Sequence, residues 1–354
     1  MKIYFLCVGL LFSYNLELVN SLSNLGINIV VDAQSNLARL MLLHEKIKGN
    51  CKAKIRYISV LPKLIPLKSY FGTFDLVHLN SISSYSMKVA KIANCPKIFV
   101  LHEAPIPKSV YDVLKGYVDM FVAPSEFTAK NEAPKVGFTP IVIHHGVNMH
   151  LFNDSIQKDV ARRKLHIPYN AKVVLWNDRI SPEKDLETLL KAIPLIAREA
   201  PDVYFYIKGR AVNKGYLRRI EMMLKNCKKR RNVKIHVGWI PYEKLPLLYR
   251  SADVFVRTSL YENFGLGFVE AMACGVPVIV ADVPIAREVL GEAALFFKPR
   301  DSMDLADKVI YLLSNSDEGE ILARKGLRRV KEKFTLNMMT QKYLNLYRSL
   351  VERV

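Results

Sequence analysis

The stretch from Ser259 to Pro277 (SLYENFGLGFVEAMACGVP) most constrains what this chain can fold into. It predicts a loop, then a short helix, then a buried strand over residues 276–280. Gly265 and Gly267 leave the main chain bare where the helix begins, so a ligand can come close to the amides there. The N–H groups of a helix's first turn have no partner within the helix, and the helix dipole is positive at that end. The stretch therefore predicts an anion-binding turn.

Two carboxylates flank this turn, Glu262 on the loop and Glu270 on the helix, with seven residues between them. This spacing allows both to face one ligand. Main-chain amides bind phosphate and carboxylates accept hydrogen bonds from vicinal hydroxyls, so the ligand that fits carries a phosphate together with sugar hydroxyls. A capped surface helix with two solvated glutamates is the simpler alternative, because glutamate is seldom buried.

The whole stretch resembles the Glu-x7-Glu motif of retaining glycosyltransferases of the GT-B fold, in particular glycosyltransferase family 4 (glycosyl transferases group 1). The resemblance implies transfer of a sugar, with retention of configuration, from a UDP- or GDP-sugar to a glycan, lipid-linked or other hydroxyl acceptor. It implies that Glu262 holds hydroxyls of the donor sugar and that Glu270 holds the ribose. The main-chain amides of Phe264, Gly265 and Leu266 would lie beside the diphosphate.

A second turn, which follows a predicted strand at 173–176, carries Arg179 and Lys184. A guanidinium and an ammonium at the carboxyl end of a strand can neutralise a diphosphate without a metal ion. Alone, Arg-x4-Lys would be read as a surface pair. In its context the pair resembles the family's Gly-Arg-x4-Lys motif, which implies that both residues hold the departing diphosphate during catalysis. Asp178 stands where the family has glycine, so either its side chain turns outward or the donor lies differently.

Three further site positions rest on the resemblance. His102 ends a predicted strand and corresponds to a family histidine near the transferred sugar, although a lone histidine is more often structural. Ile240 corresponds to the turn that borders the nucleobase. Gly9 belongs to the turn on the acceptor side, where the family is glycine-rich and this chain keeps a single glycine.

Apolar strands alternate with helical segments from residue 3 onwards, which predicts doubly wound α/β domains. A length of 354 residues suits about two domains. The resemblance, which covers residues 74–301, implies a GT-B fold: two Rossmann-like parallel-sheet domains that face a central cleft. We place an acceptor domain at 1–165, a donor domain at 166–334 and a helix that crosses back to the first domain at 335–354.

The chain has 52 Lys and Arg against 33 Asp and Glu, and its net charge of +19 predicts attraction to anionic partners. Residues 45–70 alternate basic with apolar side chains. This stretch forms either a solvated basic face or a surface that docks on an anionic membrane or a lipid-phosphate acceptor, since each Lys or Arg near such a leaflet contributes ~1 kcal/mol. Five scattered cysteines favour a reducing compartment. We therefore expect a cytoplasmic protein, peripheral on the inner face of the membrane.

We expect no cofactor and no metal ion, because the chain contains no Asp-x-Asp and two cations already serve the diphosphate. A nicotinamide-dependent oxidoreductase is rejected: residues 265–270 begin like G-x-G-x-x-G but end in Glu270, where that fingerprint needs glycine. The alternative function is a catalytically inactive GT-B-like protein that binds an anionic partner such as lipid or nucleic acid. Nucleic acid is the less favoured partner, because no aromatic residues interleave the basic run at 228–231.

Overall fold

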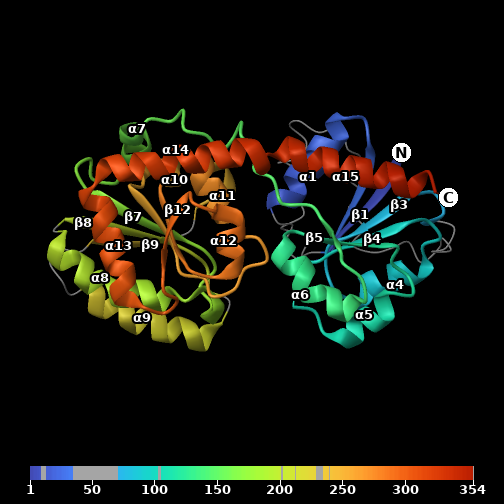
Figure 1. Ribbon diagram of the computed structural model, residues 1–354, viewed down its shortest axis with the longest axis horizontal. Coiled ribbons are helices and arrows are strands. Elements are labelled where there is room, and N and C mark those ends of the chain that lie inside the picture. The colour runs from blue at the N-terminus through green and yellow to red at the C-terminus, as the bar shows by residue number, and fades with distance from the viewer. Residues whose placement is uncertain are drawn as a thin grey trace. The chain divides into compact units, whose positions relative to one another are not determined.

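The structure, a computed structural model, describes residues 1–8, 13–34, 71–102, 105–200, 202–211, 213–228, 234–238 and 240–353 (Figure 1). Gly9 and the basic stretch 45–70 lie outside these residues. The chain divides into two compact units. Unit 1 comprises Met1–Gly146 and Leu336–Val354, and unit 2 comprises Val147–Thr335.

Unit 1 is built on a parallel sheet with the strand order β2-β1-β3-β4-β5-β6. The strands are β1 (Lys2–Val8), β2 (Asn28–Gln34), β3 (Leu76–Leu79), β4 (Lys97–Val100), β5 (Met120–Ala123) and β6 (Ile141–Val142). Most are short apolar runs, as expected of parallel strands covered on both faces. The helices on one face are α4 (Ser84–Ile92), α5 (Lys108–Leu114) and α6 (Glu126–Val136). On the other face lie α1 (Ser13–Asn24) and α15 (Leu336–Val351) (Figure 1).

A buried hydrogen bond ties α15 to β3 across most of the sequence. His78 Nδ1 lies 2.6 Å from the Tyr347 hydroxyl, and His78 Nε2 lies 3.1 Å from Asn80 Oδ1. Burial lowers the pKa of His78 to about 3, although the hydrogen bond to Asn80 opposes this, so the ring is neutral. Asn80 Oδ1 can only accept, so Nε2 carries the proton and Nδ1 accepts from Tyr347. The last helix is therefore part of the core of unit 1.

Unit 2 contains a second parallel sheet, with the order β12-β11-β10-β7-β8-β9. Counted from β9, this is the order 3-2-1-4-5-6 of doubly wound nucleotide-binding folds. The strands are β7 (Lys172–Asn177), β8 (Val203–Lys208), β9 (Lys234–Gly238), β10 (Val254–Arg257), β11 (Val278–Ala281) and β12 (Ala294–Phe297).

The helices of unit 2 lie on both faces of this sheet (Figure 1). One face packs against α8 (Leu186–Glu199), α9 (Lys214–Lys228) and α13 (Ser302–Ser314). The other carries α10 (Leu245–Ser251) and α11 (Leu266–Ala273), with α12 (Pro284–Leu290) beside α11. Two more helices, α7 (Lys158–Lys164) and α14 (Ser316–Lys333), pack on α10 and α11, respectively.

The alternation of side chains along the strands brings three polar residues to one face. The core against α8, α9 and α13 contains the strand residues Val174, Trp176, Val203, Phe205, Ile207, Val254 and Val256. Because side chains alternate between faces, Asn177, Lys208 and Arg257 point to the α10–α11 side. Each is the last residue of its strand. They lie about the point between β7 and β10 where the strand order reverses, which is where open α/β sheets bind ligands.

The predicted fold class, two doubly wound parallel α/β domains, is confirmed. The boundary differs from the predicted one: residues 147–165 lie in unit 2, not in the first domain. Arg162, which is buried, donates to the Ser251 carbonyl (3.1 Å) and to Asp253 (2.7 Å). The sequence does not show that residues 147–165 belong to unit 2, because the partners of Arg162 come some 90 residues later in the chain.

In the described ranges, no helix is both long enough and apolar enough to cross a bilayer.

We predict that Tyr347→Phe lowers the free energy of unfolding by about 1–3 kcal/mol, because the buried His78 acceptor loses its donor. Tyr343, about one turn earlier, is the matched control. Its buried hydroxyl makes no hydrogen bond with any residue that the structure describes, so Tyr343→Phe should cost nothing or stabilise. Urea unfolding of both variants measures the difference, and equal losses would contradict the role given to Tyr347.

Candidate functional site

Two cations and two carboxylates meet where β7 and β10 end, and we name them the charge cluster: Asp178, Lys184, Arg257 and Glu262. Arg257 Nη2 lies 2.6 Å from Asp178 and 2.8 Å from Glu262. Lys184 Nζ lies 2.7 Å from Glu262 and 3.4 Å from Asp178. The four side chains are between 6% and 9% exposed. Their formal charges cancel, which is what makes the burial of so many ions tolerable.

The start of α11 is shaped around Arg257. A Cβ atom on Gly267 would lie 2.6 Å from Arg257 Nη1, so a side chain there would displace the guanidinium from its present position. The guanidinium also lies 5.5 Å from the centre of the Phe268 ring and donates to the Asn177 carbonyl at 2.8 Å. Gly265 precedes the helix with φ +84°, a conformation that other residues rarely adopt. The glycines that predict an anion-binding turn therefore also accommodate the buried Arg257 guanidinium next to that turn.

Lys184 is held by the main chain as well as by its ion pairs. It ends a short 3-10 turn, Pro182–Lys184, and its carbonyl accepts a 2.7 Å hydrogen bond from the Thr258 hydroxyl. The Leu260 amide donates to the Glu183 carbonyl at 2.9 Å. The loop after β7 and the loop after β10 are thus joined, and this places Lys184 against Glu262.

The two motif glutamates sit in different electrostatic surroundings. Burial raises the pKa of Glu262, but the charges of Arg257 and Lys184 outweigh it and bring the pKa to about 2. Burial raises the pKa of Glu270 to about 7, and the hydrogen bond from Tyr249 with the charges of Lys208 and Arg257 only partly opposes this. Glu262 is therefore a carboxylate throughout the physiological range, whereas Glu270 changes its charge near neutral pH.

A chain of hydrogen bonds connects Glu270 to the charge cluster. The Tyr249 hydroxyl donates to Glu270 Oε2 at 2.8 Å, and Asn177 Nδ2 donates to the Tyr249 hydroxyl at 2.9 Å. Arg257 then donates to the Asn177 carbonyl. Glu262 and Glu270 thus belong to one connected polar site at the amino end of α11.

The structure brings several predicted site residues together and leaves others apart. Lys184 and Glu262 are members of the charge cluster, and Gly265 and Leu266 open α11 beside it. Arg179 is exposed instead, with its side chain 63% accessible and its guanidinium 3.5 Å from Glu183. Arg179 and Lys184 thus lie in different surroundings, one exposed and one buried, and their joint hold on a diphosphate stays a prediction.

Asp178 does not turn outward, one of the two alternatives that the sequence leaves open. Its carboxylate points into the charge cluster, because a buried guanidinium and ammonium lie within 4 Å of it. The Phe264 ring packs in the interior, 5.5 Å from that of Phe334, so this residue has only its main chain to offer a ligand. Ile240 is buried two residues after β9.

His102, the remaining predicted site residue, lies in unit 1. Its Nε2 is 3.1 Å from Asn80 Oδ1, and its ring stacks on that of His145 with 5.2 Å between the centres. Burial, together with the charges of His145 and His78, lowers the pKa of His102 well below its ordinary value. The imidazole is therefore neutral.

Sequence reasoning missed Arg257, Asn177 and Tyr249. Arg257 directly follows the apolar run at 254–256, and a polar residue at the carboxyl end of a buried strand is a signal that could have found it. Asn177 gives the same kind of signal after 173–176. Tyr249 gives none, because its position against Glu270 depends on how α10 packs on the sheet.

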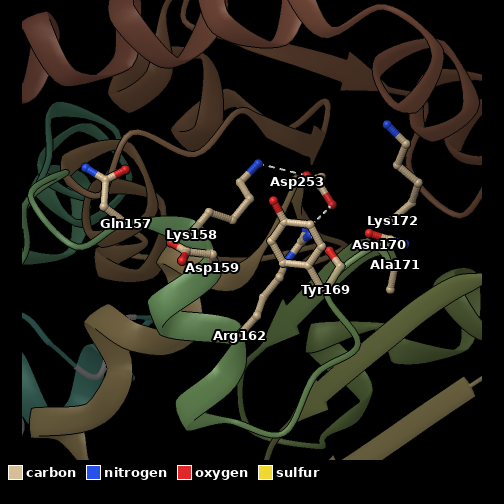
Figure 2. Close-up of a pocket in the computed structure, with 9 residues that line it drawn as sticks. All are labelled: Gln157, Lys158, Asp159, Arg162, Tyr169, Asn170, Ala171, Lys172 and Asp253. Carbon is tan, nitrogen blue, oxygen red and sulfur yellow. Dashed lines mark hydrogen bonds and ion pairs between the residues drawn. The ribbon is translucent and has the colours of Figure 1, made fainter.

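A pocket of ≈ 400 Å³ lies at the opposite ends of the strands (Figure 2). It is lined by Lys172, the first residue of β7, whereas the charge cluster follows the last. Asp253 accepts there from Lys158 (2.8 Å), from Arg162 (2.7 Å) and from the Val173 amide (2.7 Å). These charges are satisfied by one another and hold α7 against the sheet, so we assign this pocket a structural role.

The arrangement in unit 2 can bind an anionic ligand with hydroxyl groups. First-turn amides of α11 and the ammonium of Lys184 suit phosphate, and two carboxylates suit hydroxyls. In the part of the chain that the structure describes, no three His, Cys, Asp or Glu side chains group so as to hold a metal ion.

We predict that Glu270 makes stability depend on pH. Its pKa in the folded state, about 7, exceeds the ordinary 4.5, so its contribution is full below pH 4.5 and is lost as the pH rises through 7. Relative to Glu270→Gln, the wild type should lose about 3 kcal/mol between pH 4.5 and pH 8. Urea unfolding across this range measures the difference, with Glu292→Gln as the exposed control; parallel curves for wild type and Glu270→Gln would contradict the assignment.

One known protein family matches part of the chain. The family glycosyl transferases group 1 matches residues 157–329, which include the whole charge cluster. The chain is 29% identical over 191 residues to O-antigen chain mannosyltransferase B of Escherichia coli, covering 50% of this chain and 45% of that protein. It is 26% identical over 289 residues to the phosphatidyl-myo-inositol mannosyltransferase of Mycobacterium leprae, covering 78% and 74%. The chain spans about half the length of some curated relatives: 45% of the E. coli protein and 54% of an uncharacterised glycosyltransferase of Methanocaldococcus jannaschii.

Solved structures share the fold over the whole chain. A glycosyltransferase from Rickettsia africae superposes with a TM-score of 0.81 at 20% identity and covers 100% of this chain and 99% of its own. The Anabaena protein Alr3699/HepE, in complex with UDP and glucose, gives 0.81 at 20% identity, with 99% and 100% covered. The GT-B fold and the resemblance to group 1 glycosyltransferases are thereby confirmed. Residues 157–329, most of unit 2, therefore match the glycosyl transferases group 1 family, and the chain has the GT-B fold.

Proposed function

We propose that this protein is a retaining glycosyltransferase, which moves a sugar from a nucleotide-diphosphate-sugar to a hydroxyl acceptor. The charge cluster at the switch point of unit 2, beside the first turn of α11, is the observation that carries the proposal. The family supports a transferase. The Anabaena structure named as a complex with UDP-glucose supports a nucleotide-sugar donor.

The proposed chemistry follows from where charge develops. As the bond between the sugar and the diphosphate breaks, negative charge accumulates on the diphosphate. Fixed cations and helix amides that face this charge lower the barrier without having to reorganise. In this proposal Lys184 and the amides of Gly265 and Leu266 contact the diphosphate. The acceptor oxygen forms the new bond to the sugar, and its proton passes to the departing diphosphate.

Glu262 suits a role in holding hydroxyls of the donor sugar. Its contacts with Lys184 and Arg257 use Oε1, and none within the described residues uses Oε2. With a pKa of about 2, the group stays an acceptor at neutral pH. Glu270, one helix turn and more into α11, would accept from the ribose when it is ionised.

For the acceptor we propose a glycan or a lipid-linked hydroxyl, since the named relatives are O-antigen and phosphatidyl-myo-inositol mannosyltransferases. With a lipid-linked acceptor we propose a peripheral membrane location on the cytoplasmic side.

A second candidate function, that of a catalytically inactive binding protein, is favoured by one observation. The carboxylate of Asp178 already occupies the cations that would otherwise meet the phosphate. Saturable nucleotide binding without turnover would identify that second function.

We predict that Lys184→Ala lowers kcat about 10²- to 10³-fold, the usual effect of removing one group that stabilises developing charge. Lys191→Ala, an exposed lysine of α8, should keep the wild-type rate. Because Lys184 is buried, thermal unfolding of the variant must show a folded protein before rates are compared. A folded Lys184→Ala variant with the wild-type rate would place the diphosphate elsewhere.

We predict turnover with at least one of a panel of UDP-, GDP- and ADP-sugars, and the same turnover in the presence of EDTA. The reason is that protein cations and amides, rather than a metal ion, neutralise the diphosphate in this proposal. Release of nucleoside diphosphate measures turnover with each donor, in the absence and in the presence of EDTA. Activity that EDTA abolishes and Mg²⁺ or Mn²⁺ restores would overturn the metal-independent mechanism.

A further inference from the structure

The charge cluster by itself offers a ligand no net positive charge. Lys184 and Arg257 are balanced by Asp178 and Glu262, each within 3.4 Å of a partner. Arg179 lies outside the cluster and pairs with Glu183. A nucleoside diphosphate brings two or more negative charges, so any cation beyond the cluster, Arg179 or another, would favour its binding.

Lys208 lies where such a cation would be useful. It is the last residue of β8 and the register partner of Asn177 on β7, so both side chains project from the same face of the sheet. Its carbonyl accepts from the Asp178 amide at 3.1 Å, which fixes it beside the charge cluster. Its register partner on the other side, Gly238, has no side chain to cover it.

The ammonium of Lys208 is partly buried without a fixed partner. No ion pair or hydrogen bond joins it to another side chain in the described part of the chain, although it is close enough to Glu270 and Asp178 for their charges to act on it. Burial lowers the pKa of Lys208, and those two carboxylates oppose the effect. Glu270, with a pKa of about 7, is ionised only in part at neutral pH. A partly desolvated cation without a full counter-charge is costly unless a ligand supplies one.

The chain of hydrogen bonds indicates which part of a ligand Lys208 would meet. Asn177, its neighbour across the ladder, leads through Tyr249 to Glu270. Glu270 is the carboxylate that the proposed function gives to the ribose. A cation beside it is near the phosphate that is bonded to the ribose. An ammonium binds a phosphate as a point charge and does not need the two-pronged geometry of a guanidinium.

Resting on the proposed function, we propose that Lys208 is a donor-binding residue that contacts the phosphate next to the ribose. It would supply the positive charge that the charge cluster lacks. Lys208 would accordingly contribute to the affinity for nucleoside phosphates and not to that for the free nucleosides.

Calorimetric titration with UDP and with GDP tests the proposal on wild type, Lys208→Met and Lys208→Gln, and NMR titration measures uridine and guanosine. We expect both variants to bind the nucleoside diphosphate about 10- to 100-fold more weakly, the effect of one lost charged hydrogen bond. Nucleoside affinity should not change, and Lys208→Arg should keep most of the phosphate-dependent affinity. Lys172→Met, at the exposed opposite end of β7, is the matched control and should bind like the wild type.

The outcomes separate two failures. If the wild-type protein binds neither UDP nor GDP, the proposed function is contradicted, and so is the inference about Lys208. Wild type that binds one of them, with an unchanged affinity in a folded Lys208→Met or Lys208→Gln variant, would overturn the inference alone. Equal weakening of nucleoside and nucleoside diphosphate would also overturn it, because Lys208 would then be structural.

Discussion

The guanidinium of Arg257 is the contact on which the site in unit 2 depends. It bridges Asp178 from the end of β7 and Glu262 from the loop after β10, and it passes beneath the glycine-lined start of α11. Removing it would leave two buried carboxylates with Lys184 alone, and breaking a buried pair of this kind typically costs 3–5 kcal/mol. One strand-end residue thus fixes the two loops and the helix start together.

The surroundings of the two motif glutamates give them different ionisation states. Glu262 lies against two cations and is held ionised, whereas Glu270 receives one tyrosine hydroxyl and is raised toward neutrality. Pairs of carboxylates whose surroundings push their pKa values apart are a recurring feature of sites that do chemistry. The two cations and two carboxylates of the charge cluster already balance before any ligand arrives. An additional cation such as Lys208 would therefore favour the binding of a diphosphate.

The sequence predicts those parts of the structure that local patterns decide. The strand at 173–176 and the turn at Gly265 lie where expected, because an apolar run and glycine punctuation act over a few residues. Arg257 and Lys208 were missed, because their importance comes from the register of β10 and β8 on β7, which pairs residues 30 to 80 positions apart. Arg179, which the sequence places in the site, is exposed and pairs with Glu183, and its contact with a diphosphate stays a prediction. The family resemblance predicts which residue types belong to the site, whereas the packing of strands and helices determines which of these residues contact one another.

A crystal structure with UDP or GDP bound is the most direct test of the central claim, that the charge cluster and the start of α11 form a phosphate site. We predict that the diphosphate lies within hydrogen-bonding distance of Lys184 and of the Gly265–Gly267 amides, with the ribose on Glu270. A nucleotide that binds with its phosphates away from these groups would contradict it.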